Sequence, residues 1–128
     1  GTLSGHPLTM AAGIATLAAL EPERYVALEE TAEALASGLR EAADAAGREV
    51  SVVRVGSLLT LFFRSTEPLD AADALASDRE AYARFFRAML DRGILLPPSQ
   101  FEAWFLSTAH GEAELEATLD AARAALRT

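Results

Sequence analysis

The strongest structural signal in the chain is segment 23–47, where apolar residues recur at alternating spacings of three and four. This period puts them on one face of an α-helix, and most of the acidic residues fall on the other face. Gly47 is the expected end, because glycine readily takes the left-handed conformation that closes many helices. The predicted apolar face consists of Tyr25, Leu28, Ala32, Leu35, Leu39, Ala42 and Ala46.

After this helix the apolar period changes to two, which is typical of strands. Segment 49–55 is expected to form one strand, with Val50, Val52 and Val55 at or near the core. Gly56 and Ser57 predict a turn, and segment 58–64 is apolar enough to be a second strand buried on both faces. The two strands are expected to pair as an antiparallel hairpin.

The second half of the chain predicts two more helices and two more strands. Asp70 can cap a short helix over 71–76, and Ser77 with Glu80 forms a capping box for the helix that ends at 91–93. Segments 94–96 and 101–109 are expected to be strands, and segment 112–127 a final helix. The expected core positions of the two longer helices are Tyr82, Phe85, Phe86, Met89 and Leu90, and then Leu115, Leu119, Ala122 and Leu126. The fold class is therefore α+β, a small and mostly antiparallel sheet with helices packed on it.

The first helical segment, 8–20, differs from the others because it is apolar around its whole circumference. Such a helix is normally buried. It is expected to stop before Pro22, since the residue preceding a proline disfavours helical geometry. Segment 8–20 therefore reads as a helix taken from a larger structure, one that needs a partner surface.

Composition excludes several kinds of chemistry. The net charge of −8 disfavours a nucleic-acid partner, because such a surface repels phosphate backbones. The chain has no cysteine, which removes disulfides and thiolate ligands and fits a cytoplasmic protein. All eleven basic residues are arginine, so the chain cannot supply the lysine amine of a Schiff base. The two histidines, His6 and His110, lie too far apart to predict a metal site.

Polar residues stand among large apolar ones in PPSQFEAWFLSTAH, residues 97–110. A carboxylate at Glu102 would need a partner or a wet cleft if its strand borders a covered surface; otherwise it is an outward residue of a half-exposed strand. Ser99 and Gln100 fit ordinary turn chemistry after two prolines. At the other end of the chain, Gly1 and Thr2 precede a helix and can be read either as a loop or as an anion site.

The chain as a whole resembles the C-terminal part of the class III aminotransferase family of pyridoxal-phosphate enzymes. The run PSQFEA-F-S-AH is typical of the family's aminomutase branch, and the chain departs from the usual pattern at His6, Trp104 and Gly111. The stretches that carry the resemblance are GTLSGHPLTMAAGIATL, RVGSLLTLFF, FFRAMLDRGILLPPSQFEAWFLSTAH and LDAARAAL.

The resemblance implies a homodimeric enzyme that converts glutamate-1-semialdehyde to 5-aminolevulinate, using pyridoxal phosphate and pyridoxamine phosphate. Residues 1–21 would end the large cofactor-binding domain, and residues 22–128 would form the C-terminal small domain. Gly1 and Thr2 match a pair that binds the cofactor phosphate of the partner subunit. Glu102 matches an acidic residue that faces the substrate pocket, with Ser99 and Gln100 in the loop leading to it. The catalytic lysine would lie upstream, so the isolated chain is predicted to be inactive.

The sequence is also compatible with two alternatives. One is another class III aminotransferase, which acts between two substrates; an arginine at position 102 would have favoured it. The other is an interaction domain without chemistry, which would use the apolar segment 8–20 as its docking surface.

Overall fold

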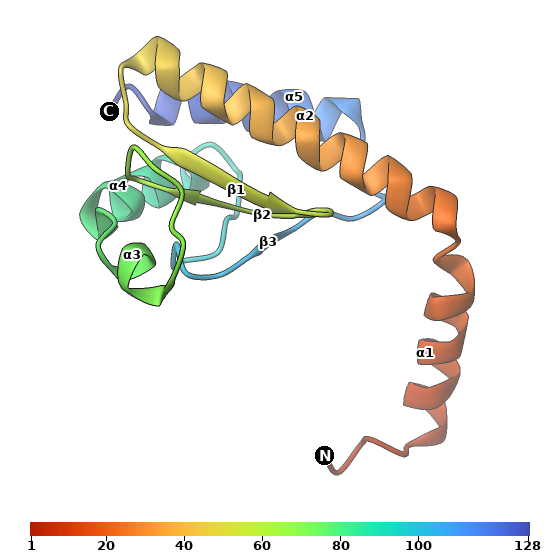
Figure 1. Cartoon of the computed structure of the whole chain (residues 1–128). Helices are drawn as coiled ribbons and strands as arrows, with labels where there is room; N and C mark the ends of the chain where they lie inside the picture. Colours follow the sequence, from red (N-terminus) through yellow and green to blue (C-terminus); the bar gives the residue numbers. More distant parts are fainter.

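The computed structural model describes residues 1–128, which form five helices and one small sheet (Figure 1). Helices α2 and α5 lie side by side over one face of the sheet, α3 and α4 lie toward one end of it, and α1 projects away. The elements are α1 (Pro7–Ala19), α2 (Pro22–Ala46), β1 (Ser51–Val55), β2 (Leu58–Phe62), α3 (Ala71–Leu75), α4 (Arg79–Leu90), β3 (Trp104–Phe105) and α5 (Glu112–Ala125). The predicted α+β class is confirmed.

The sheet has three antiparallel strands in the order β1-β2-β3. The predicted hairpin is confirmed, and its turn contains Gly56 at φ 59°, a conformation that glycine adopts without strain. Val52 pairs with Leu61 and Val53 pairs with Thr60, so the two pairs lie on opposite faces. The face of Val52 and Leu61 packs against α2, and we call the opposite face the outer face.

The core lies between the sheet and the helices. Val52, Leu59 and Leu61 of the sheet are at most 2% exposed. They belong to a cluster with the buried faces of α2, α4 and α5. On the outer face, Val55 is 76% exposed, so the expectation that it lies near the core is wrong. Leu58 is 38% exposed, so the expectation that β2 is buried on both faces is also wrong. The helical members of the cluster include Leu35, Leu39, Phe85, Met89, Ala122 and Leu126.

Helix α2 is longer than the layer that it covers. Its predicted C-terminal stop is confirmed, with Gly47 at φ 64°. The apolar face is buried from Ala32 onward, whereas Tyr25 in the first turn is 49% exposed. Arg54 of β1 joins the sheet to the middle of α2 through Glu33, with Nε and Oε2 2.8 Å apart.

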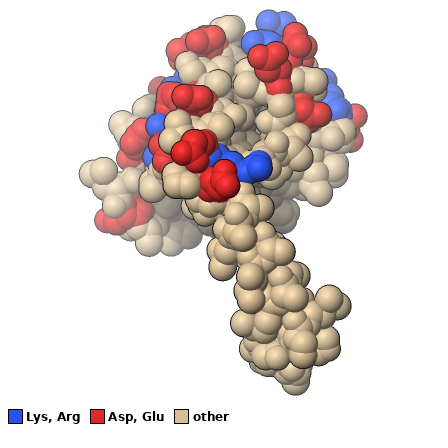
Figure 2. Space-filling view, turned by 90° about the vertical axis from the view of Figure 1, so that its right-hand side faces the viewer, with Lys and Arg blue, Asp and Glu red and all other residues tan.

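Helix α1 has none of its residues buried, although the sequence predicts a buried helix. Its bounds agree with the prediction, since it ends at Ala19 before Glu21 and Pro22, and His6 accepts a hydrogen bond from the Leu8 N–H at its start. Figure 2 shows the helix as an extension without charged side chains, beneath a charged body. Every residue of this helix is exposed, so its apolar surface stays open. No helix of the chain meets the length and hydropathy that a bilayer crossing requires.

Helix α4 begins one residue later than the predicted capping box requires. Its N-cap is Asp78, whose Oδ1 accepts from the N–H groups of Glu80 and Ala81 at 3.0 and 2.9 Å. Ser77 is buried and its hydroxyl has no partner, so the Ser77–Glu80 box is wrong. A carboxylate at this position interacts with the helix dipole more favourably than a hydroxyl does. The predicted Asp70 cap of α3 is confirmed.

Two predicted strands are absent or much shorter than expected. Residues 94–96 form no strand, and only Trp104–Phe105 of the predicted strand 101–109 pairs with β2. Pro97 and Pro98 have no N–H to donate to a ladder, and turns at Ser99 and at Ser107 flank the two paired residues. The sheet therefore has three strands where the sequence predicts four.

Candidate functional site

The segment 97–103 has no helix or strand and is attached to the body at both ends. At its start, the Tyr82 hydroxyl donates to the Pro97 carbonyl at 2.7 Å. At its end, Trp104 is 4% exposed and pairs with Leu59 of β2. Since Tyr82 belongs to α4 and Leu59 to the sheet, the segment bridges these two elements.

A tight turn occupies the middle of this segment. The Glu102 N–H donates to the Ser99 carbonyl at 3.2 Å, and the Ser99 hydroxyl accepts from the Phe101 N–H at 3.2 Å. This is the turn chemistry that the sequence indicates for Ser99. The turn brings Ser99 and Glu102 together through their backbones.

Gln100 is the buried residue of this turn, whereas Phe101 and Glu102 are exposed. Its side chain is 2% exposed, and neither its amide nitrogen nor its amide oxygen has a hydrogen-bond partner. It borders a cavity of about 170 Å³ beside α4, which Arg79 and Tyr82 also line. Gln100 is thus enclosed beneath the turn, whereas Glu102 is exposed on its surface.

Glu102 is held from the sheet as well as from its own turn. The hydroxyl of Thr60, on β2, donates to the Glu102 carbonyl at 3.2 Å. None of the ion pairs in the structure involves the Glu102 carboxylate. The carboxylate is therefore accessible to a ligand and carries no internal counter-charge.

The outer face of the sheet forms a shallow apolar depression beside this turn. Its volume is about 250 Å³. Phe105 lies opposite Leu58 in the ladder and is 75% exposed, so it extends the same apolar surface. An apolar surface with one carboxylate near it suits a ligand that carries a cationic group. The residues that line the depression are Val53, Val55, Leu58, Leu59, Thr60, Phe62 and Pro68.

Electrostatics also connect Glu102 to Tyr82. The pKa of Tyr82 is raised to about 12, mainly by burial and to a smaller extent by the negative charge of Glu102. The indole of Trp104 acts in the opposite direction; its N–H lies near the hydroxyl but makes no hydrogen bond of good geometry. Tyr82 therefore stays protonated at neutral pH and continues to donate to Pro97.

Gly1 and Thr2 lie far from this turn. They are exposed residues ahead of α1, at the end of the chain that points away from the sheet in Figure 1. The Gly1 carbonyl accepts from the Ser4 N–H at 3.0 Å, and the Thr2 hydroxyl has no partner. The chain alone does not bring its two predicted groups of site residues together.

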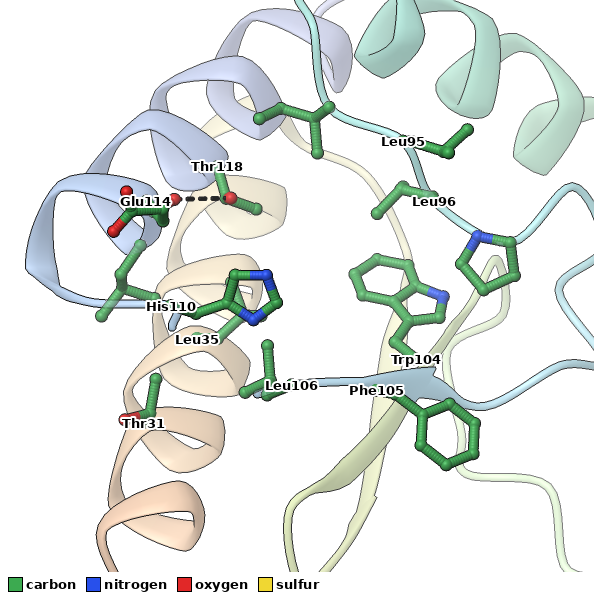
Figure 3. Close-up of a pocket in the computed structure, with 13 residues that line it drawn as sticks. Thr31, Leu35, Leu95, Leu96, Trp104, Phe105, Leu106, His110, Glu114 and Thr118 are labelled. Atoms are coloured by element: carbon green, nitrogen blue, oxygen red, sulfur yellow. Dashed lines mark hydrogen bonds between the residues drawn. The ribbon is translucent and has the colours of Figure 1, made fainter. Parts of the chain in front are cut away.

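A second cavity, of about 140 Å³, lies between α2, α5 and the segments around residues 95 and 106 (Figure 3). His110 points into it from the start of α5, and its Nδ1 accepts from the Ser107 N–H at 3.0 Å. The remaining wall is mostly apolar, with Leu35, Leu96 and Trp104 among its residues. No group of three or more histidine and acidic side chains is placed to hold a metal ion.

Two residues of the site, Thr60 and Tyr82, are absent from the sequence-based candidates. Tyr82 is predicted only as a core residue, and its hydrogen bond to Pro97 depends on the tertiary fold. Thr60 is the one polar residue of the apolar stretch 58–63, which is the only local signal that could have marked it.

The fold is that of the C-terminal part of transaminase and aminomutase structures. An omega-transaminase from Sphaerobacter thermophilus superposes with a TM-score of 0.83 at 30% sequence identity, over 99% of this chain and 29% of that chain. A glutamate-1-semialdehyde-aminomutase from Pseudomonas aeruginosa PAO1, crystallised in complex with PMP, superposes with a TM-score of 0.85 over 98% of this chain and 28% of that chain. The sequence identity to this aminomutase structure is 24%, so this second comparison shows a shared fold only.

In sequence, the chain matches the C-terminal portion of glutamate-1-semialdehyde 2,1-aminomutase. The enzyme from Desulfatibacillum aliphaticivorans is 51% identical over 128 residues, which are 99% of this chain and 30% of that protein. The chain thus spans about 30% of the length of the curated relatives that it matches. No family model matches the chain.

Proposed function

We propose that this chain is the C-terminal part of a glutamate-1-semialdehyde 2,1-aminomutase, a pyridoxal-phosphate-dependent isomerase that forms 5-aminolevulinate. The observation that carries the proposal is 51% identity to such an enzyme along 99% of the chain. The proposal includes the homodimer and the cytoplasmic location that the family resemblance implies.

We further propose that residues 1–21 belong to the large domain and residues 22–128 to the small domain. The open apolar surface of α1 supports this division, because a helix without a single charged residue needs a protein surface to cover it. The boundary falls between Ala19 and Pro22, where α1 ends and α2 begins.

The cofactor fits this chain only in part. With no lysine, the chain cannot bind pyridoxal phosphate covalently, so it contributes a phosphate contact and no more, and we propose that it is inactive alone. Thr2 offers a free hydroxyl and, with Gly1, exposed backbone ahead of a helix, which suits a phosphate. The bound cofactor supplies the electron sink for chemistry at the amino-bearing carbon.

Glu102 is proposed as the substrate-pocket residue. Its carboxylate is exposed, free of ion pairs and close to an apolar depression, so it can attract the ammonium group of an amino substrate. The same charge disfavours a substrate carboxylate at this point, which selects against substrates of the related aminotransferases. Ser99 and Gln100 are proposed to shape the turn that carries it.

The test uses the full-length protein that contains this chain, with glutamate-1-semialdehyde as the only substrate. We expect 5-aminolevulinate to form without an added amino donor. Glu102→Gln should lower kcat/KM by about tenfold or more, since a hydrogen bond to a charged group contributes roughly 1.5–3 kcal/mol. Glu116→Gln, on the exposed side of α5, is the matched control. Normal turnover of the Glu102 variant would disprove the proposed role of this residue.

The second candidate is an aminotransferase that acts between two substrates. The superposition with an omega-transaminase at 30% identity favours it. The same assay separates the two functions, because an aminotransferase needs an external amino donor and releases a second product. Turnover that depends strictly on such a donor would replace the aminomutase with this candidate.

A further inference from the structure

The ladder between β2 and β3 stops abruptly at the turn that carries Glu102. Leu58 pairs with Phe105 and Leu59 with Trp104, and no further backbone pair follows. The next residue of β2 is Thr60, and its hydroxyl donates to the Glu102 carbonyl at 3.2 Å. A side-chain donor thus continues the attachment where the backbone ladder ends.

Both backbone polar groups of Glu102 are consequently engaged. Its N–H donates to Ser99 within the turn, and its carbonyl accepts from Thr60. The first bond holds Glu102 only relative to its own turn. The second fixes it to β2, which is the central strand of the sheet and pairs on both sides. Thr60 therefore sets the position of Glu102 relative to the rigid part of the molecule.

We propose that Thr60 is a positioning residue for Glu102 in the aminomutase reaction. This inference rests on the proposed function, in which the Glu102 carboxylate contacts the substrate. A carboxylate must be held close to its productive position to be effective, and residues on strands provide this support better than loops do. Without the Thr60 donor, the turn keeps its internal bond and its attachment through Trp104, but Glu102 loses its own direct bond to the sheet.

The substitution Thr60→Val separates this role from a structural one. Valine has nearly the same shape and favours strands as threonine does, but it cannot donate a hydrogen bond. Glu102 is exposed, so water can satisfy its carbonyl in the variant, and the fold should survive. Thr60→Ser keeps the donor and loses only the methyl group.

The experiment measures kcat and KM of the full-length enzyme for glutamate-1-semialdehyde. We expect Thr60→Val to lower kcat/KM by about three- to tenfold, the effect of one ordinary hydrogen bond. Thr60→Ser should stay within about twofold of the unsubstituted enzyme, since it keeps that bond. Thr118→Val is the matched control, because its hydroxyl donates at 2.7 Å to a carbonyl of its own helix, Glu114. Should Thr60→Val fail to fold, Thr60→Ser and Thr60→Ala form a second pair that differs only in the hydroxyl.

A double-substitution cycle with Glu102→Gln decides whether Thr60 acts through Glu102. We expect Thr60→Val to have no further effect on kcat/KM once the carboxylate is gone. If Thr60→Val lowers kcat/KM equally in the unsubstituted enzyme and in the Glu102→Gln enzyme, the assignment is overturned. It is also overturned if Thr60→Val has normal kinetics while Glu102→Gln is impaired. If Glu102→Gln itself is harmless, the proposed role of Glu102 fails first and the assignment of Thr60 fails with it.

Discussion

Gly38 of α2 lies directly against the side chain of Leu119 on α5. A Cβ atom added at Gly38 would be 2.6 Å from Cδ2, 2.7 Å from Cδ1 and 3.2 Å from Cγ of Leu119. Glycine in a helix costs about 1 kcal/mol relative to alanine. Its presence here is explained by the close approach of α2 and α5, whose contact builds much of the core.

Gly38→Ala should therefore destabilise the chain although alanine favours helices. Overpacking costs about 1–3 kcal/mol and the gain in helix propensity is about 1 kcal/mol, so the net loss is up to about 2 kcal/mol. The sign should reverse in a Leu119→Ala background, where the added methyl group finds space. Urea unfolding of the four proteins measures both effects. Gly13→Ala in α1 is the control, since no atom lies within 4 Å of the added Cβ. If Gly38→Ala stabilises the chain that still carries Leu119, the packing argument is wrong.

Tyr82 predicts a loss of stability in alkaline solution. Its pKa is raised from 10.0 to about 12, mainly by burial, so the folded chain holds the phenolic proton more tightly than the unfolded chain does. The contribution to the free energy of unfolding is complete below about pH 10 and disappears as the pH rises through about 12. Ionisation also removes the hydrogen bond to Pro97 at the start of the segment that carries Glu102.

The measurement is a tyrosinate absorbance titration of the 128-residue chain, which has two tyrosines. In the variant Tyr25→Phe, the remaining signal belongs to Tyr82 and should titrate above the usual range of tyrosine. Tyr82→Phe should flatten the dependence of unfolding on pH between about 10 and 12. A Tyr25→Phe chain that titrates at the ordinary value while still folded would contradict the burial argument.

The proposed phosphate contact of Thr2 predicts that its hydroxyl contributes to cofactor retention in the full-length protein. Thr2→Ala removes a free hydroxyl that is proposed to donate to the cofactor phosphate, which should weaken retention by about 1–3 kcal/mol. Dialysis followed by absorbance of the retained cofactor measures the change. Thr16→Ala is the control, because its hydroxyl donates at 2.9 Å to Ala12 within α1. Equal retention in the Thr2 and Thr16 variants would remove Thr2 from the site.

The helices follow from sequence because their signal is local. In α2 and α4 the apolar period of 3.6 continues for several turns, and Gly47 and Gly93 mark ends that the structure confirms. The sequence does not decide the N-cap of α4, because Ser77 and Asp78 can both cap a helix. In the structure Asp78 is the cap, since its side chain accepts hydrogen bonds from two N–H groups; this geometry depends on the direction in which the chain enters the helix.

The strands after Gly93 fail for a different reason. Alternating apolar residues indicate a strand only if a partner is available along the whole segment. Turns at Ser99 and Ser107 leave only Trp104 and Phe105 of segment 101–109 paired with β2. The same tertiary dependence hides Thr60, which meets Glu102 across 42 positions of sequence. Glu102 can be singled out from the sequence as a carboxylate among large apolar residues, but its role in a substrate pocket follows only from the family resemblance, since a single acidic residue indicates no chemistry.

The contacts of Asp73, in α3, predict a loss of stability in acid. The pKa of its carboxyl is lowered, mainly because it accepts a hydrogen bond at 3.0 Å from the Leu69 N–H, and the charge of Arg64 lowers it further. A lowered pKa contributes stability above the ordinary value for aspartate, and this stability is lost as the pH falls below it. Asp73→Asn should therefore unfold less steeply with falling pH than the unsubstituted chain. Asp44→Asn, on the exposed face of α2, is the control, and the same acid profile for both variants would show that the loop contact contributes nothing.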